Sequence, residues 1–125
     1  MRNLATLFRP RSIAVIGASR DPHSVGYTIL ENLKKGFRGS IYAVNPHATE
    51  INGVRSFPDI GSLPEVVDIS LICVPSKIVP MILTQSGEKG IKNAIIISAG
   101  FKEAGDEGVR LEKECQSIAK HYGIS

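Results

Sequence analysis

A glycine-containing loop near the start of the chain has the residues to hold an anionic ligand. Residues 17–26, Gly-Ala-Ser-Arg-Asp-Pro-His-Ser-Val-Gly, follow a short apolar run and precede a helical pattern. The N–H groups at a helix start face a bound anion, and the helix dipole strengthens the attraction. Gly17 permits a sharp turn and Gly26 a close approach, and Ser19 and Ser24 add hydroxyl groups. The loop therefore predicts a phosphate-binding site; the alternative is an ordinary turn in which Ser24 is the helix N-cap.

The glycine spacing separates this loop from the dinucleotide-binding fingerprint. That fingerprint reads G-x-G-x-x-G, whereas the first glycine after Gly17 is Gly26. It also requires a carboxylate after the second strand, to bind a ribose hydroxyl. The sequence has Asn45, Pro46 and His47 at that place. An NAD(P)-binding module is therefore disfavoured and is kept as an alternative.

Short apolar runs mark the strands that must position this loop. Four of them end at turn residues: Ser12–Ile16, Ser40–Val44, Ile69–Val74 and Ala94–Ile97. Runs that are apolar on both faces are typical of a parallel sheet covered by helices on both sides. Between Asn45 and Asp68 the signal weakens. There Gly53–Phe57 is a candidate edge strand and Ile60–Leu63 a candidate helical turn.

Helical spacing of apolar residues fills the gaps between these runs. It predicts helices over Val25–Phe37, from near Val79 to Lys89, and over Glu107–Tyr122 with Gly123 as its cap. The strand–helix alternation predicts an α/β fold with one domain and a Rossmann-like, doubly wound parallel sheet. We expect the strand order 3-2-1-4-5, with Gly53–Phe57 at one edge and Ile69–Val74 beside Ser12–Ile16.

In such sheets ligands bind beyond the carboxyl ends of the strands. The loops after four of the predicted strands are therefore candidates, although turn geometry alone would also explain the later ones. The candidate ligand-binding residues are Gly17, Ala18, Ser19, Arg20, Ser24, Val25, Gly26, Asn45, Pro46, His47, Val74, Pro75, Ser76, Lys77, Ser98, Ala99 and Gly100. Four basic side chains on these loops could meet a further phosphate: Arg20, His23, His47 and Lys77.

Other chemistry finds little support in the sequence. The three histidines do not cluster along the chain, and no metal-ligand spacing or Ser/His/Asp set is present, so no catalytic or metal-binding residue is predicted. Cys73 and Cys115 are expected to be buried thiols, as in a reducing cytoplasm. The net charge of +3 is spread along 125 residues, which does not indicate nucleic acid as a partner. No stretch suits a signal peptide or a membrane span.

The motifs together resemble a known enzyme family. The segment Leu7–Ser19, LFRPRSIAVIGAS, resembles the start of the ADP-forming (NDP-forming) acetate/acyl-CoA ligases, relatives of the succinyl-CoA synthetase alpha subunit. The resemblance covers nearly the whole chain, in order, through Val44–Pro46, Ile51–Gly53, Val74–Ser76 and Ser98–Phe101. It implies that the domain binds coenzyme A, with the phosphates on residues 17–26 and the other three loops bordering the nucleotide.

The resemblance also implies what the chain lacks. In that family, acid, CoA and ATP are interconverted with acyl-CoA, ADP and phosphate through a phosphohistidine that lies in a later domain, and an ATP-grasp domain holds the nucleotide. We therefore expect residues 1–125 to be the N-terminal CoA-binding part of a longer cytoplasmic protein. It would be inactive alone and would work with further ligase domains or an ATP-grasp subunit. Consistent with this, Ile124-Ser125 is expected to begin another strand. Similar domains open bacterial protein lysine acetyltransferases, and a regulatory domain of such a fusion stays open as an alternative.

Overall fold

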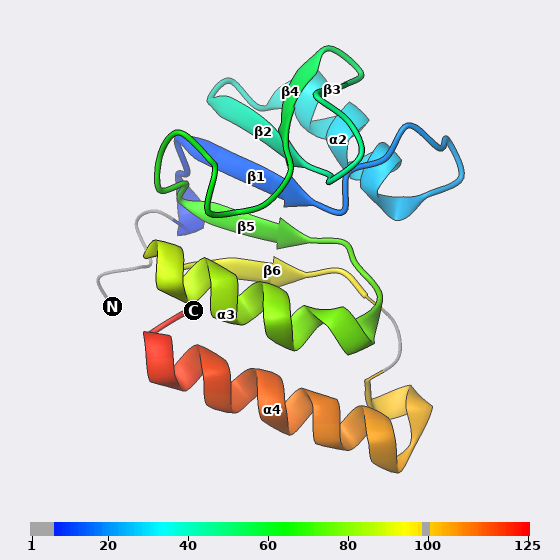
Figure 1. Cartoon of the computed structure of the whole chain (residues 1–125), viewed down its shortest axis with the longest axis vertical. Helices are drawn as coiled ribbons and strands as arrows, with labels where there is room; N and C mark the ends of the chain where they lie inside the picture. The colour runs from blue at the N-terminus through cyan, green and yellow to red at the C-terminus, as the bar shows by residue number, and fades with distance from the viewer. Residues whose placement is uncertain (1–6, 99–100) are drawn as a thin grey trace.

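Six strands form one sheet in the order β3-β4-β2-β1-β5-β6 (Figure 1). The structure is a computed structural model, which describes residues 7–98 and 101–125 and, of Lys102, only the backbone. The strands are β1 (Ser12–Ile16), β2 (Ser40–Val44), β3 (Glu50–Ile51), β4 (Val54–Phe57), β5 (Ile69–Ile72) and β6 (Ala94–Ile96). The helices are α2 (Val25–Gly36), α3 (Val79–Lys89) and α4 (Asp106–Tyr122), with the short 3₁₀ turns η1 (Ser76–Ile78) and η2 (Lys102–Ala104).

The strand order confirms the expected doubly wound sheet. Strand β1 pairs in parallel with β2 on one side and β5 on the other, and β2 and β5 pair in parallel with β4 and β6. The sequence analysis missed β3, which pairs antiparallel with β4. The expectation that Gly53–Phe57 forms the edge strand is therefore wrong: β3 is the edge, β4 lies inside it, and Gly53 belongs to the turn between them. Strands β5 and β6 also end earlier than expected, since residues 73–74 and 97 already belong to the loops.

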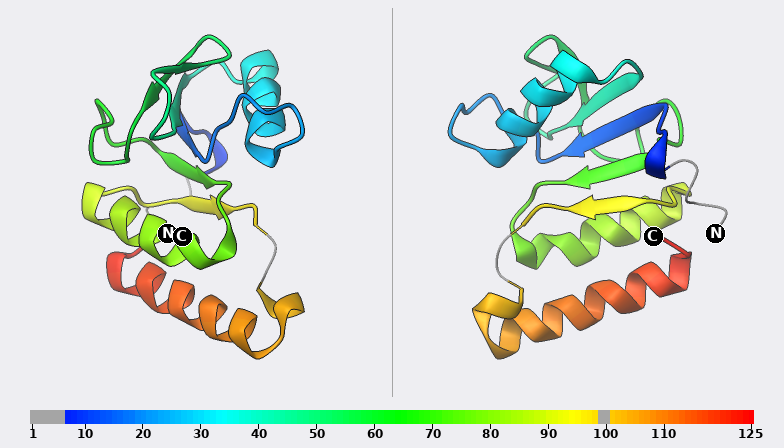
Figure 2. Two further views of the ribbon diagram at one scale, coloured as in Figure 1. Left: turned by 45° about the vertical axis from the view of Figure 1, so that its right-hand side comes forward. Right: turned by 180° about the vertical axis from the view of Figure 1, so that it is seen from behind.

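Alternate residues of β1 face two different apolar layers. Ala14 and Ile16 pack in one cluster with Leu83 of α3 and Cys115 of α4, whereas Val15 packs in another with Leu30 of α2. Because neighbouring strand residues point to opposite faces, α2 covers one face and α3 and α4 the other. Figure 2 shows the sheet and these helices obliquely and from behind.

The helix boundaries follow local chemistry. Pro80 occupies the first turn of α3, where its missing N–H costs nothing. Helix α4 ends at Gly123, which adopts a left-handed φ of 67°. The candidate helical turn at Ile60–Leu63 is present as a single hydrogen-bonded turn, in which the Leu63 amide donates to the Ile60 carbonyl at 3.2 Å. Within the described residues, no helix is long and apolar enough to cross a membrane.

Candidate functional site

Gly17 sits where three strand ends converge. Its amide donates to the Val44 carbonyl at 3.1 Å, and its φ is +90°. A Cβ on Gly17 would lie 2.4 Å from the Cys73 carbonyl oxygen. Only glycine meets both demands, so the sharp turn expected after β1 is present. This turn starts the loop at the carboxyl edge, between the ends of β2 and β5.

Gly26 places the start of α2 directly against this turn. A Cβ on Gly26 would lie 2.1 Å from the Gly17 carbonyl oxygen, well inside any real contact. The close approach predicted for Gly26 is therefore an approach of helix to loop backbone. It fixes the first turn of α2 over the end of β1.

The serine hydroxyls of the loop shape its own backbone. Ser19 accepts from the Asp21 amide at 3.0 Å. Ser24 is the N-cap of α2: its hydroxyl accepts from the Tyr27 amide at 3.1 Å and donates to the Asp21 carbonyl at 2.8 Å. In the described part of the chain, the Val25 and Gly26 amides have no hydrogen-bond acceptor. The loop thus presents backbone donors at the helix start, as an anion site requires.

Two side chains tie the candidate loops together. Asn45, at the end of β2, donates from Nδ2 to the Ala18 carbonyl at 2.9 Å and accepts from the His47 amide at 2.7 Å. The Ser98 hydroxyl donates to the Val74 carbonyl, which joins the loop after β6 to the loop after β5. The structure therefore brings all four predicted loops to one edge of the sheet. Ala99 and Gly100 lie outside the described residues.

The sequence analysis missed a hairpin that flanks this edge. Asn52 (φ 51°) and Gly53 (φ 80°) form its turn between β3 and β4. Asn-Gly is the preferred pair for two successive left-handed residues in a hairpin, so this dipeptide was an available signal. The two-residue strand before it was too short to show any period.

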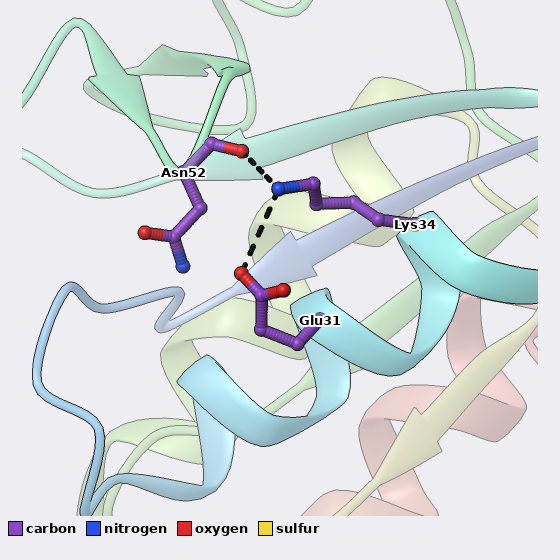
Figure 3. A network of polar contacts seen from close by, with 3 residues as sticks. All are labelled: Glu31, Lys34 and Asn52. Carbon is purple, nitrogen blue, oxygen red and sulfur yellow. Dashed lines mark hydrogen bonds and ion pairs between the residues drawn. The ribbon is translucent and has the colours of Figure 1, made fainter.

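Two cations attach the hairpin to neighbouring segments: Arg20 from the candidate loop and Lys34 from the last turn of α2. The Arg20 guanidinium donates to the Glu50 carbonyl at 2.6 Å. Lys34 Nζ donates to the Asn52 carbonyl at 2.5 Å and lies 3.6 Å from the Glu31 carboxylate (Figure 3). Arg20, one of the four side chains expected to meet a phosphate, is therefore engaged with backbone.

The remaining basic candidates are exposed. His23 lies in the loop before α2, His47 follows β2, and Lys77 lies on η1. Pro46 and Pro75 are exposed beside them, while Val74 and Ser76 are half-buried. Among the described residues, no hydrogen bond or ion pair of the Lys77 side chain is present. Within those residues no group of histidine, cysteine and carboxylate side chains is placed to bind a metal.

The two cysteines differ in exposure. Cys115 is buried as predicted, but Cys73 is only half-buried, because it lies just beyond β5 at the carboxyl edge. Burial raises the pKa of each thiol from 9.0 to about 11, and the carboxylates of Glu114 and Glu112 add to the effect at Cys115.

These thiol pKa values predict slow alkylation of the folded chain. At pH 8 the thiolate fraction of the folded chain is about a hundredfold lower than for a thiol with a pKa of 9.0, so iodoacetamide should react much faster once urea unfolds the chain. As the pH rises, the thiols of the unfolded chain lose their protons at a lower pH than those of the folded chain. The free energy of unfolding should therefore fall as pH rises from 9 toward 11. Mass spectrometry of the labelled chain measures the first effect. Equal labelling rates in both states would contradict the prediction.

Comparisons with known proteins agree with this geometry. Residues 11–125 match the family described as a CoA binding domain. The alpha subunit of the ADP-forming acetate–CoA ligase II of Pyrococcus furiosus is 47% identical over 117 residues, which are 94% of this chain and 26% of that protein. The corresponding ligase II of Archaeoglobus fulgidus is 46% identical over 123 residues, 98% of this chain and 18% of its own length.

A solved structure matches equally well. The dinucleotide-forming acetyl-coenzyme A synthetase 1 of Ca. Korarchaeum cryptofilum, in complex with phosphate and ADP, is 42% identical, with a TM-score of 0.93. The match covers 99% of this chain and 26% of that one. The chain thus spans about a quarter or less of the length of these relatives. With its Rossmann-like sheet and its match over residues 11–125, the chain belongs to the CoA-binding domain family.

Proposed function

We propose that this chain is the CoA-binding module of an ADP-forming acid–CoA ligase, and that residues 17–26 hold the phosphates of CoA. The observation that carries the proposal is the start of α2, where the Val25 and Gly26 amides have no hydrogen-bond acceptor among the described residues and the helix begins against the Gly17 turn. Two such amides beside a helix N-terminus suit a diphosphate. The names of the relatives support CoA as the diphosphate that is bound.

The other loops would complete the ligand site. Asn45, Pro46 and His47 lie next to the phosphate loop through the Asn45–Ala18 bond, and Val74–Lys77 and Ser98 follow along the edge. We place the adenosine part of CoA against these loops. With Arg20 engaged by the hairpin, Lys77 is our candidate for contacting the 3′-phosphate.

The proposed reaction joins an acid to CoA at the expense of ATP, giving acyl-CoA, ADP and phosphate. This chain would bind and orient CoA or acyl-CoA, and further ligase domains or a subunit with an ATP-grasp fold would supply the rest. The acetate–CoA ligases among the relatives support this division, because each is several times longer than the matched region. We expect no acyl-CoA formation by the 125 residues alone.

The proposal predicts that the chain binds CoA in preference to NADH and NADPH, and that Val25→Pro weakens this binding. Proline removes the Val25 amide but suits the first helical position, and Ser24 before it is already extended (φ −87°, ψ 152°). Losing one charge-assisted hydrogen bond, worth about 1.5–3 kcal/mol, should lower the affinity for CoA about 10- to 100-fold. Titration calorimetry measures all three ligands on both chains.

Val25→Ala is the matched control. It removes the same half-exposed side chain but keeps the amide, so its CoA affinity should stay within about threefold of the unchanged chain. Urea unfolding of both variants checks that α2 still forms. Tighter binding of NADH than of CoA would contradict the proposed ligand. A folded Val25→Pro chain with full CoA affinity would instead move the phosphates away from the start of α2.

A further inference from the structure

The β3–β4 hairpin turns on an asparagine that is followed directly by a glycine. Both residues have positive φ, 51° for Asn52 and 80° for Gly53, which makes the turn type I′. Ile51 and Val54 pair on either side of it, so the loop consists of these two residues. In an Asn-Gly pair the backbone nitrogen of the glycine can attack the asparagine side chain with little hindrance, because glycine has no side chain.

The Gly53 amide is free to act as the attacking group. Among the described residues it donates no hydrogen bond. Gly53 is exposed, and nothing lies within 4 Å of a Cβ built on it, so hydroxide can reach its proton and the peptide has room to turn. The Asn52 side-chain nitrogen is buried but has no hydrogen-bond partner in the described part of the chain. No hydrogen bond of this nitrogen therefore opposes movement of the amide.

The present turn keeps the two reacting groups apart. In a type I′ turn the carbonyl oxygen of the first central residue, and not the next nitrogen, lies on the side of its Cβ. Rotation of the peptide between the central residues gives a type II′ turn, with a ψ of about −120° at the first, and brings that nitrogen to the Cβ side. Both types have positive φ at the first residue and close a two-residue hairpin. Rotation of the Asn52–Gly53 peptide would therefore leave β3 and β4 paired.

Lys34 opposes this rotation. Its Nζ donates to the Asn52 carbonyl at 2.5 Å, and this is the oxygen that must turn away. The Glu31 carboxylate, 3.6 Å from the same Nζ, holds the ammonium group from one turn earlier on α2. Figure 3 shows the side-chain amide of Asn52 pointing away from Lys34. The bond therefore restrains the main chain and leaves the amide untouched.

We propose that Asn52 is a site of intramolecular deamidation, and that Lys34 slows the reaction by holding the turn in its type I′ form. The Gly53 nitrogen attacks Cγ of Asn52, and the new C–N bond closes a succinimide ring. The Cγ–Nδ2 bond breaks, and the proton lost by the Gly53 amide leaves with the side-chain nitrogen as ammonia. Water then opens the ring, at Cγ to give aspartate or at the main-chain carbonyl to give isoaspartate. This proposal does not rest on CoA binding.

The charge of Lys34 has a second effect, of opposite sign. A cation at a carbonyl oxygen makes the N–H of the same peptide more acidic, which by itself would speed the attack. In the type I′ turn, however, the acidified nitrogen lies on the side away from Cβ. After the rotation, the Asn52 oxygen has left the Lys34 Nζ. Restraint of the rotation therefore decides the outcome.

The modification would change how the hairpin is attached. Isoaspartate carries one more carbon in the main chain, so the two-residue turn and the position of the carbonyl that Lys34 binds would both be lost. Aspartate would add a negative charge beside the pair formed by Lys34 and Glu31. Arg20 would still hold the Glu50 carbonyl. The turn would thus be released from α2 while the start of β3 stays in place.

The test follows the folded chain in mildly alkaline buffer made with water that carries heavy oxygen. Peptide mapping by mass spectrometry measures labelled aspartate and isoaspartate at position 52. Lys34→Met removes the donor and keeps the apolar stem, whereas Lys34→Arg keeps a cationic donor. Lys35→Met is the matched control, because it makes the same charge change at an exposed neighbour that has no hydrogen bond to the hairpin among the described residues.

Lys34→Met should convert Asn52 at least about threefold faster than the unchanged chain, and Lys35→Met and Lys34→Arg within about 1.5-fold of it. The chain denatured in guanidinium should convert fastest. Equal rates in Lys34→Met and the unchanged chain, or equal acceleration by both methionine variants, would overturn the role of Lys34. So would an acceleration no larger than the rise in unfolded fraction measured by urea unfolding. Absence of labelled product in every folded chain, while the denatured chain converts, would overturn the site itself.

Discussion

Replacing Gly26 by valine should lower the free energy of unfolding by about 3 kcal/mol, or prevent folding altogether. The new Cβ would lie 2.1 Å from the Gly17 carbonyl oxygen and 3.2 Å from the Ala18 Cα, all of them backbone atoms that no rotamer change can move. The first turn of α2 would have to lift from the loop. Urea unfolding followed by circular dichroism measures the loss.

Gly36→Ala is the matched control on the same helix. Nothing lies within 4 Å of a Cβ at Gly36, and alanine favours helix, so stability should hold or rise by up to about 1 kcal/mol. If Gly26→Val unfolds at the same urea concentration as the unchanged chain, the prediction is wrong, and the close packing of Gly26 on the Gly17 carbonyl does not limit stability. A loss of CoA binding in Gly26→Val would follow from the displaced helix, so Val25→Pro is the better probe of the proposed phosphate site.

Leu30→Ala should cost about 2–5 kcal/mol of stability. Leu30 is fully buried and packs with Val15 of β1 and Ala43 of β2, so the truncated side chain would leave a cavity between α2 and the sheet. Leu30 belongs to the apolar face that holds α2, and with it the loop of residues 17–26, against the strands. The midpoint and slope of urea unfolding give the free energy.

Asn32→Ala, two residues further along α2, is the matched control for Leu30→Ala. Asn32 is exposed, so its truncation should change stability by less than about 0.5 kcal/mol. A cost below about 1 kcal/mol for Leu30→Ala would mean that the neighbouring side chains collapse into the space. It would also mean that α2 is held mainly by its contact at Gly26.

The parallel part of the sheet could be predicted from sequence because each strand is a short apolar run that ends at a turn residue. Ser12–Ile16 is buried along its whole length, which is the condition that the run indicates. Strand β3 could not be found this way, since two residues carry no period. The Asn52-Gly53 dipeptide was the feature of the sequence that could have predicted the hairpin.

The sequence predicted that the candidate loops share one edge of the sheet, but not the contacts that their side chains make there. Position after a strand brings the loops to one edge, and the Asn45–Ala18 and Ser98–Val74 bonds join them there. The partners of the Ser19 and Ser24 hydroxyl groups could not be predicted, because several backbone groups lie within reach of each hydroxyl. The partner of Arg20 depends on where the hairpin lies, and local sequence patterns do not predict a contact between residues so far apart in the chain.

The attachment of the hairpin has a consequence for protein engineering. Arg20 and Lys34 both end on main-chain oxygens, at Glu50 and Asn52, and every amino acid supplies such an oxygen. A library that varies the exposed side chains at Thr49, Glu50 and Arg55 would therefore leave the attachment intact. The hairpin could then carry varied side chains near the candidate loops, while Arg20 and Lys34, which are not part of the library, keep it in place.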